Sequence, residues 1–136
     1  MLKLSKVISI ETIFTAFSKT CDKNFHFSGE SHNFWEFLYI VDGCMGVAVE
    51  DTIFELNKGE MIFYAPMEFH SVWAEKGKEA KIIIMSFSIY GDEFNNMSGR
   101  IFTVSEKNKS LTVEIRRIEI QDVVIFRCIQ ANGNVM

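Results

Sequence analysis

The chain has 136 residues, of which 48% are hydrophobic and 24% are charged, and its formal net charge is −4. This length suits one domain with a single core, and this composition excludes a disordered chain. The acids gather in residues 30–75, where nine carboxylates stand against Lys58 alone, so this segment disfavours nucleic-acid binding, which needs clustered Lys and Arg.

The amino-terminal segment, residues 1–25, is predicted to form an arm ahead of the main fold. Glu11 interrupts its apolar run and no small-residue cleavage site follows, so we expect no signal peptide. No part of the chain approaches the roughly 18 consecutive apolar residues of a membrane helix. The cysteines form no C-x-x-C pair, which predicts reduced thiols at Cys21, Cys44 and Cys128. We expect a cytoplasmic protein that does not contact membranes.

Short apolar runs separated by turn signals follow from Phe34 onward. Their aromatic and β-branched residues favour strands, and the Gly, Asn and Pro residues between them mark the breaks. The predicted strands cover residues 34–41, 45–50, 52–56, 61–64, 69–74 and 81–89. Several short strands at close spacing predict an antiparallel sandwich or barrel.

The first of these strands has large apolar residues on both faces. Alternation places Leu38 and Ile40 on one face, and Phe37 and Tyr39 on the other. A strand with one solvent-exposed face would have polar residues on that face. We therefore expect both faces of this strand to be covered by other parts of the protein. The covering element is the amino-terminal segment, a later helix, or another subunit.

The chain changes character after Gly91. Residues 91–100 are predicted to form a loop, and Ser105 is suited to cap a helix from about 106 to 118. The apolar stripe of this helix is a candidate two-fold dimer contact, with packing onto its own barrel as the equal alternative; it consists of Leu111, Ile115 and Ile118. Residues 119–136 fit either a strand or a second helix.

Three polar residues lie among large apolar ones in the stretch ESHNFWEFLYIVDG, residues 30–43. Glu30, His32 and Glu36 are separated by even numbers of residues, so a strand would point them the same way. A buried carboxylate without a partner is costly, and we therefore expect Glu36 to pair with His32 or His70, or to await a donor from a ligand. His26, just before this stretch, is expected on a solvated loop or edge strand.

Three segments together resemble a cupin barrel and, more narrowly, the sensor half of AraC-type transcription regulators: ESHNFWEFLYIVDG, FELNKGEMIFYAPMEFH and KIIIMSFSI. The resemblance covers about residues 24–89, and residues 99–119 are similar to the linker and first helix that follow the barrel in that family. The matching positions are His32, Glu36 and Gly43 in the first segment and Gly59, Pro66 and His70 in the second.

The resemblance implies one domain over residues 1–136, mainly β, with a cupin-like antiparallel barrel or jelly roll at 26–90 and one or two C-terminal helices after it. It implies an effector-sensing domain that forms homodimers. The implied ligand-binding residues are His32, Glu36, His70 and Glu30, to which Tyr39 and Trp73 are added as aromatic stacking faces. The acidic centre predicts a neutral or cationic effector of the polyhydroxy kind. The paired helix-turn-helix modules of a full regulator do not follow, so we expect no direct DNA contact by this chain.

A stand-alone metal cupin enzyme, of the isomerase or dioxygenase type, is the competing hypothesis. Metal-bearing cupins have a histidine two residues before His32, where this chain has Glu30, but two imidazoles and two carboxylates still suit a divalent metal. The ligands would be Glu30, His32, Glu36 and His70. Sensor domains of this type keep the corresponding residues without a metal, so the expected state has no cofactor. A third possibility is a structural module whose barrel is filled by side chains.

Overall fold

The computed structural model describes residues 10–91 and 95–103, which form strands and one short 3₁₀ helix. In chain order these elements are β1 (Ile10–Cys21), β2 (His26–Glu30), β3 (Trp35–Asp42), β4 (Cys44–Val49), β5 (Thr52–Asn57), β6 (Glu60–Tyr64), β7 (His70–Ala74), β8 (Ala80–Ile89), η1 (Asn95–Met97) and β9 (Ile101–Thr103). In this part of the chain, no helix has the length and hydrophobicity needed to cross a membrane.

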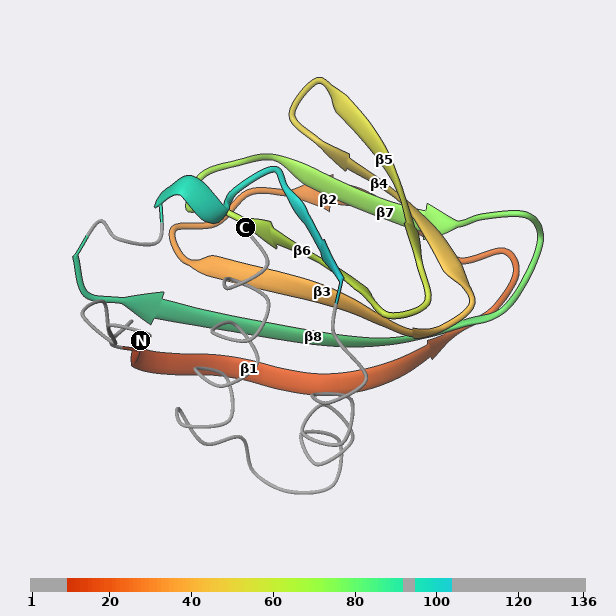
Figure 1. Cartoon of the computed structure of the whole chain (residues 1–136), viewed down its shortest axis with the longest axis horizontal. Coiled ribbons are helices and arrows are strands. Elements are labelled where there is room, and N and C mark those ends of the chain that lie inside the picture. Colours follow the sequence, from red (N-terminus) through yellow and green to blue (C-terminus); the bar gives the residue numbers. More distant parts are fainter. Residues whose placement is uncertain (1–9, 92–94, 104–136) are drawn as a thin grey trace, which may run out of the picture.

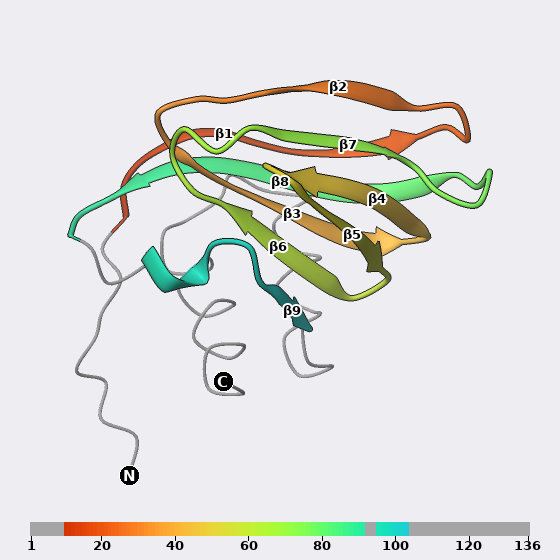
Figure 2. The same ribbon diagram turned by 90° about the horizontal axis from the view of Figure 1, so that it is seen from above.

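The strands form two antiparallel sheets that face each other (Figure 1). One sheet has the order β1-β8-β3-β6-β9, and the other has the order β2-β7-β4-β5. The edge strands β1 and β2 lie on the same side of the molecule, away from β9 (Figure 2). Since β1 and β2 belong to different sheets, the barrel is not closed by hydrogen bonds between them.

The prediction of a mainly β, antiparallel fold is confirmed, and all six predicted strands are present with small changes at their ends. Sequence reasoning missed three strands. β1 lies inside the segment expected to be an arm and pairs with β8 from Ile10 to Cys21. β2 and β9 are short, and residues 95–97 within the expected loop form η1. The predicted helix at 106–118, its stripe Leu111, Ile115 and Ile118, and the tail at 119–136 lie outside the described residues.

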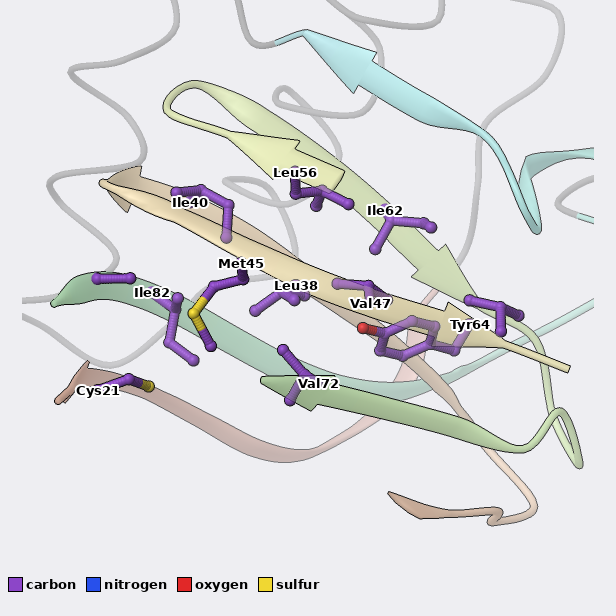
Figure 3. Close-up of a cluster of buried hydrophobic side chains, with 12 residues drawn as sticks. Cys21, Leu38, Ile40, Met45, Val47, Leu56, Ile62, Tyr64, Val72 and Ile82 are labelled. Atoms are coloured by element: carbon purple, nitrogen blue, oxygen red, sulfur yellow. The ribbon is translucent and has the colours of Figure 1, made fainter. Parts of the chain in front are cut away.

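The main core lies between the two sheets (Figure 3). Leu38 and Ile40 from β3 meet Met45 and Val47 from β4 there, and all four are at most 1% exposed. Their apolar area, removed from water on both sheets, supplies the largest stabilising contribution of the fold. The predicted alternation along β3 is therefore confirmed on its even-numbered face.

A second cluster covers the opposite face of the five-stranded sheet. Phe37 and Tyr39 of β3 pack here with Met97 of η1 and Phe102 of β9, and Ile10 and Ile13 of β1 lie against the cluster. The expectation that both faces of β3 are covered is confirmed. The amino-terminal segment supplies part of this cover, and the connection after β8 supplies another part.

Candidate functional site

A cavity of about 370 Å³ lies between the two sheets. This volume is within the range of roughly 300–1,000 Å³ that small-molecule pockets occupy. Its lining comes from both sheets: Thr15, Phe17, Lys19, Phe25, Phe27, Glu30, His32, Phe34, Glu36, Leu38, Tyr64, His70, Val72, Ile82, Ile84 and Ser86. A barrel filled by side chains is thereby ruled out.

The exposed lining residues lie on the two edge strands. Thr15, Phe17 and Lys19 belong to β1, and Glu30 belongs to β2. The lining residues of the inner strands are buried or only partly exposed. The cavity therefore meets solvent along the gap between β1 and β2, where no strand pairing closes the barrel.

Four polar side chains converge in the cavity. The Nε2 atom of His32 lies 3.3 Å from Oε1 of Glu36, and the Nε2 atom of His70 lies 3.3 Å from Oε2 of the same carboxylate. Glu30 stands farther away, with Oε1 at 3.8 Å from His32 Nε2 and 3.9 Å from His70 Nε2. The expected pairing of Glu36 is confirmed, and the carboxylate contacts both imidazoles.

Strand register brings these residues together. Glu30 at the end of β2 is opposite His70 at the start of β7, and Glu36 in β3 is flanked by Tyr64 of β6 and Ser86 of β8. A bulge precedes Glu30, at Gly29, whose φ of 122° is open to glycine alone. A Cβ at position 29 would lie 2.4 Å from the Phe69 ring, so glycine also makes room for that ring.

The loop between β6 and β7 supports both histidines. The backbone amide of Met67 donates to the carbonyl of His32 at 2.7 Å, which links this loop to the connection between β2 and β3. Glu68 accepts hydrogen bonds from the Ala65 amide at 2.6 Å and from the Ser98 hydroxyl at 2.7 Å. Met67 in this turn adopts the left-handed conformation, with φ of 70°.

Backbone carbonyls select the tautomer of each histidine. His32 Nδ1 lies 3.0 Å from the Phe34 carbonyl, and His70 Nδ1 lies 3.1 Å from the Glu68 carbonyl. A carbonyl oxygen only accepts, so each Nδ1 carries the proton and each Nε2 of a neutral ring is an acceptor. Both Nε2 atoms are buried and make no hydrogen bond. The two Nε2 atoms of the neutral rings and the two oxygens of Glu36 therefore face one another as acceptors. Only protons or an added cation can satisfy them.

Aromatic rings hold the imidazoles in place. His32 stacks on Phe34 with ring centroids 3.9 Å apart, and His70 stacks on Tyr64 with centroids 4.1 Å apart. Burial, together with the charge of Glu36, raises the pKa of Tyr64 well above its ordinary value, so this phenol stays neutral. The stacked rings restrict both histidines to the orientation that faces Glu36.

The surroundings of His70 change its affinity for a proton. Burial lowers its pKa, but the Glu36 carboxylate, the Glu68 carbonyl and the charge of Glu30 together raise it above the ordinary 6.5. The folded chain thus binds this proton more tightly than the unfolded chain. The resulting stability is fully present below pH 6.5 and is lost as the pH rises through the raised pKa.

We predict that His70→Gln flattens this pH dependence. In chelator-treated protein, urea unfolding at a series of pH values should show wild-type stability falling above about pH 6.5, and the variant should lack that fall. His26→Gln is the matched control, because His26 is exposed at the start of β2. If the free energy of unfolding of His70→Gln depended on pH as that of the wild type does, the raised pKa of His70 could not be its cause.

The structure brings four of the six predicted ligand residues together and places the other two elsewhere. Tyr39 lies in the cluster on the opposite face of β3, and it is three positions from Glu36, so alternation alone separates them. Trp73 packs against Gly46 outside the cavity, and its indole donates to Glu75 Oε1 at 2.6 Å. His26 is exposed on edge strand β2, as expected.

The apolar lining from β1, β2 and the turn between them was missed by sequence reasoning. Phe17, Phe25 and Phe27 contribute rings to the cavity. Their only signal in the sequence is a high local content of phenylalanine in residues 14–34. Which side chains of β1 and β2 face the cavity depends on the pairing of β1 with β8 and of β2 with β7. These pairs join segments that are far apart in the sequence.

The four polar residues fit a divalent metal. One ligand atom from each of Glu30, His32, Glu36 and His70 can be chosen so that all lie within 4.8 Å of one another. The Nδ1 hydrogen bonds to carbonyls leave both Nε2 atoms free to ligate, which is the usual arrangement of metal-binding histidines. The donor set is mixed imidazole and carboxylate, which suits zinc, iron, manganese or nickel.

Two antiparallel sheets around a cavity with this polar group define a cupin-like barrel. The model of the family "AraC-like ligand binding domain" matches residues 16–108, and the chain belongs to this family. The recognition made from the sequence is confirmed. A search of curated protein sequences gave no match.

Solved structures share the fold, and among them are proteins named as cupins. The cupin domain of Schizosaccharomyces pombe Cnp3 superposes with a TM-score of 0.51 and 12% identity over 54% of this chain and 51% of that one. An RmlC-like cupin from Shewanella frigidimarina gives 0.50 and 22% identity over 57% of this chain and 68% of that one. TT1209 from Thermus thermophilus gives 0.50 and 17% identity over 52% and 69%. The chain thus spans about half of the Cnp3 domain.

Proposed function

We propose that this chain is the effector-sensing domain of an AraC-type transcription regulator, and that a small organic molecule binds in the cavity between the sheets. The observation that carries the proposal is the 370 Å³ cavity with one polar cluster inside an otherwise apolar lining. Such a combination of apolar wall and few polar groups is typical of small-molecule sites.

The cavity is placed so that a ligand can change the domain. Its lining includes Phe17 and Lys19 of β1 and Phe27 of β2, so an occupant would contact the free edges of both sheets at once. Differential contact of this kind is what a ligand needs to shift the balance between two arrangements. The proposal also includes dimerisation of the chain and a cytoplasmic location.

A metal cupin enzyme is the second candidate, favoured by the convergence of the four ligand atoms within 4.8 Å. The residues that would hold the ion are Glu30, His32, Glu36 and His70. When bound, a divalent ion at such a site supplies Lewis-acid polarisation of a substrate oxygen. The protein would contribute the apolar walls that exclude water and the fixed imidazole orientation.

One experiment separates the two functions. The purified chain is stripped with chelator and screened by thermal shift against sugars, alcohols, organic amines and organic acids, while its metal content is measured by elemental analysis. We expect at least one organic compound to raise the melting temperature of the metal-free protein and to bind with one-to-one stoichiometry in calorimetry. Stoichiometric metal that is lost in His32→Ala and His70→Ala, with no organic ligand for the metal-free chain, would favour the enzyme.

A further inference from the structure

The polar atoms that converge at Glu36 are hydrogen-bond acceptors when both imidazoles are neutral. Glu36 is 13% exposed and presents both carboxylate oxygens to the imidazoles, and Glu30 adds a third oxygen within 4 Å of them. His70 is 3% exposed, and its Nε2 atom points at Glu36 without a hydrogen bond. When both rings are neutral, two Nε2 lone pairs face the Glu36 carboxylate, so this end of the cavity stabilises an added positive charge, either a proton on an imidazole or the cationic group of a ligand.

The remaining cavity wall is apolar. Four phenylalanines and five aliphatic side chains surround the polar cluster, namely Phe17, Phe25, Phe27, Phe34, Leu38, Val72, Ile82, Ile84 and, on the carbon stem of its long side chain, Lys19. The hydroxyls of Thr15 and Ser86 hydrogen-bond to each other, which uses one of their two donors. A molecule with hydroxyls along its whole length would leave most of them unpaired against this wall, at a cost in free energy.

The cation among the described lining residues stands away from the acceptors. The Nζ atom of Lys19 lies over the Phe25 ring, 4.7 Å from its centroid, on the solvent-facing strand β1. An organic anion that paired with Lys19 would press its apolar part against the Glu36 carboxylate and remove water from it. An anionic ligand is thus disfavoured whether its charged group lies at Glu36 or at Lys19.

We propose that the cavity binds a primary organic ammonium ion with an aryl or alkyl body, its head at Glu36, His32 and His70 and its body among the phenylalanines. Three N–H donors on the ammonium match the acceptors that converge there, and charge-assisted hydrogen bonds of this type are among the strongest in proteins. The body fills the apolar part of the 370 Å³ cavity. This inference rests on the proposed function and narrows the expected neutral or cationic effector to one class.

The test compares isosteric pairs on chelator-treated protein. Calorimetry measures 2-phenylethylamine against 2-phenylethanol, hexylamine against hexanol, and 3-phenylpropionate as the anion. We expect at least one amine to bind about tenfold more tightly than its alcohol, because a hydrogen bond to a charged group is stronger than a neutral one. The anion should not bind measurably. Alcohols that bind as tightly as their amines would overturn the inference.

A pair of variants locates the head group. Glu36→Gln keeps the shape of the side chain and should remove the advantage of the amine over the alcohol. The matched control is Glu55→Gln. It removes an exposed carboxylate of β5 that pairs with Lys76, and it should leave the affinities for the amine and the alcohol unchanged. Because the comparison in the wild type stands by itself, poor folding of Glu36→Gln does not remove the test. An amine advantage that survives in folded Glu36→Gln would overturn the inference.

The outcomes distinguish this inference from the function beneath it. A sugar or acid that binds in the cavity while every amine fails overturns the ammonium class and keeps the sensing function. Failure of all organic compounds, with stoichiometric metal at His32 and His70, overturns both.

Discussion

Replacing Leu56 with alanine should lower the free energy of unfolding by about 2–5 kcal/mol. Leu56 of β5 is 0% exposed in the core between the sheets, where it packs with Ile40, Met45 and Ile62. Truncation removes its transfer free energy and leaves a void that the two facing sheets cannot collapse to fill. The measurement is urea unfolding, with the slope compared between variant and wild type to check two-state behaviour.

The same strand supplies the control. Ile53 is 72% exposed, three positions before Leu56, and Ile53→Ala should change the free energy of unfolding by less than about 0.5 kcal/mol. Equal losses in the two variants would mean that the four-stranded sheet does not bury the face of β5 that the register assigns to the core.

Substituting Ile84 by tryptophan should reduce the affinity of any cavity ligand by on the order of a hundredfold. Ile84 lies in β8, lines the cavity and is only partly buried against the core, so the larger ring has space to enter. The added volume removes room from the ligand while the fold is kept, because it replaces open cavity rather than packed atoms. Calorimetry with the best compound of the thermal-shift panel measures the loss.

A matched substitution on the same strand isolates the effect of position. Lys81 is exposed and three residues before Ile84, on the other face of β8, so Lys81→Trp adds the same ring outside the cavity. Its affinity for the ligand should equal that of the wild type. Unchanged binding in Ile84→Trp, with a melting temperature that shows a folded protein, would place the ligand site outside the cavity.

Alternation predicted the face of Glu36, which lines the cavity on the same side of β3 as Leu38. Glu30 and His32 also reach this interior, but they do not share a strand with Glu36, because Glu30 ends β2 in the other sheet and His32 lies in the connection between β2 and β3. Alternation excludes Tyr39 and Trp73, since each lies three positions from Glu36 or His70 in its own strand. Those two aromatic residues were chosen by residue type, which says nothing about the face a side chain occupies.

Other features depended on contacts between distant parts of the chain. β1 lies in the segment that was expected to be an arm, and most of its side chains are exposed in the structure. Its place in the five-stranded sheet comes from pairing with β8, about 70 residues later, as in the hydrogen bond between Thr15 and Ser86 that spans 71 positions. No local pattern reports such a pairing.

By itself, the sequence determined that the chain is built of short antiparallel strands, and that β3 has large apolar residues on both faces, with Glu36 on the same face as Leu38 and Ile40. These properties follow from the two-residue period of a strand, which any segment carries within itself. Only the tertiary structure decided that β1 and β2 form the open side of the cavity, that His70 meets Glu36 from the other sheet, and that carbonyls of Phe34 and Glu68 set both tautomers. These are consequences of register and packing between sheets, where the free energy of burial selects one arrangement of segments that are locally equivalent.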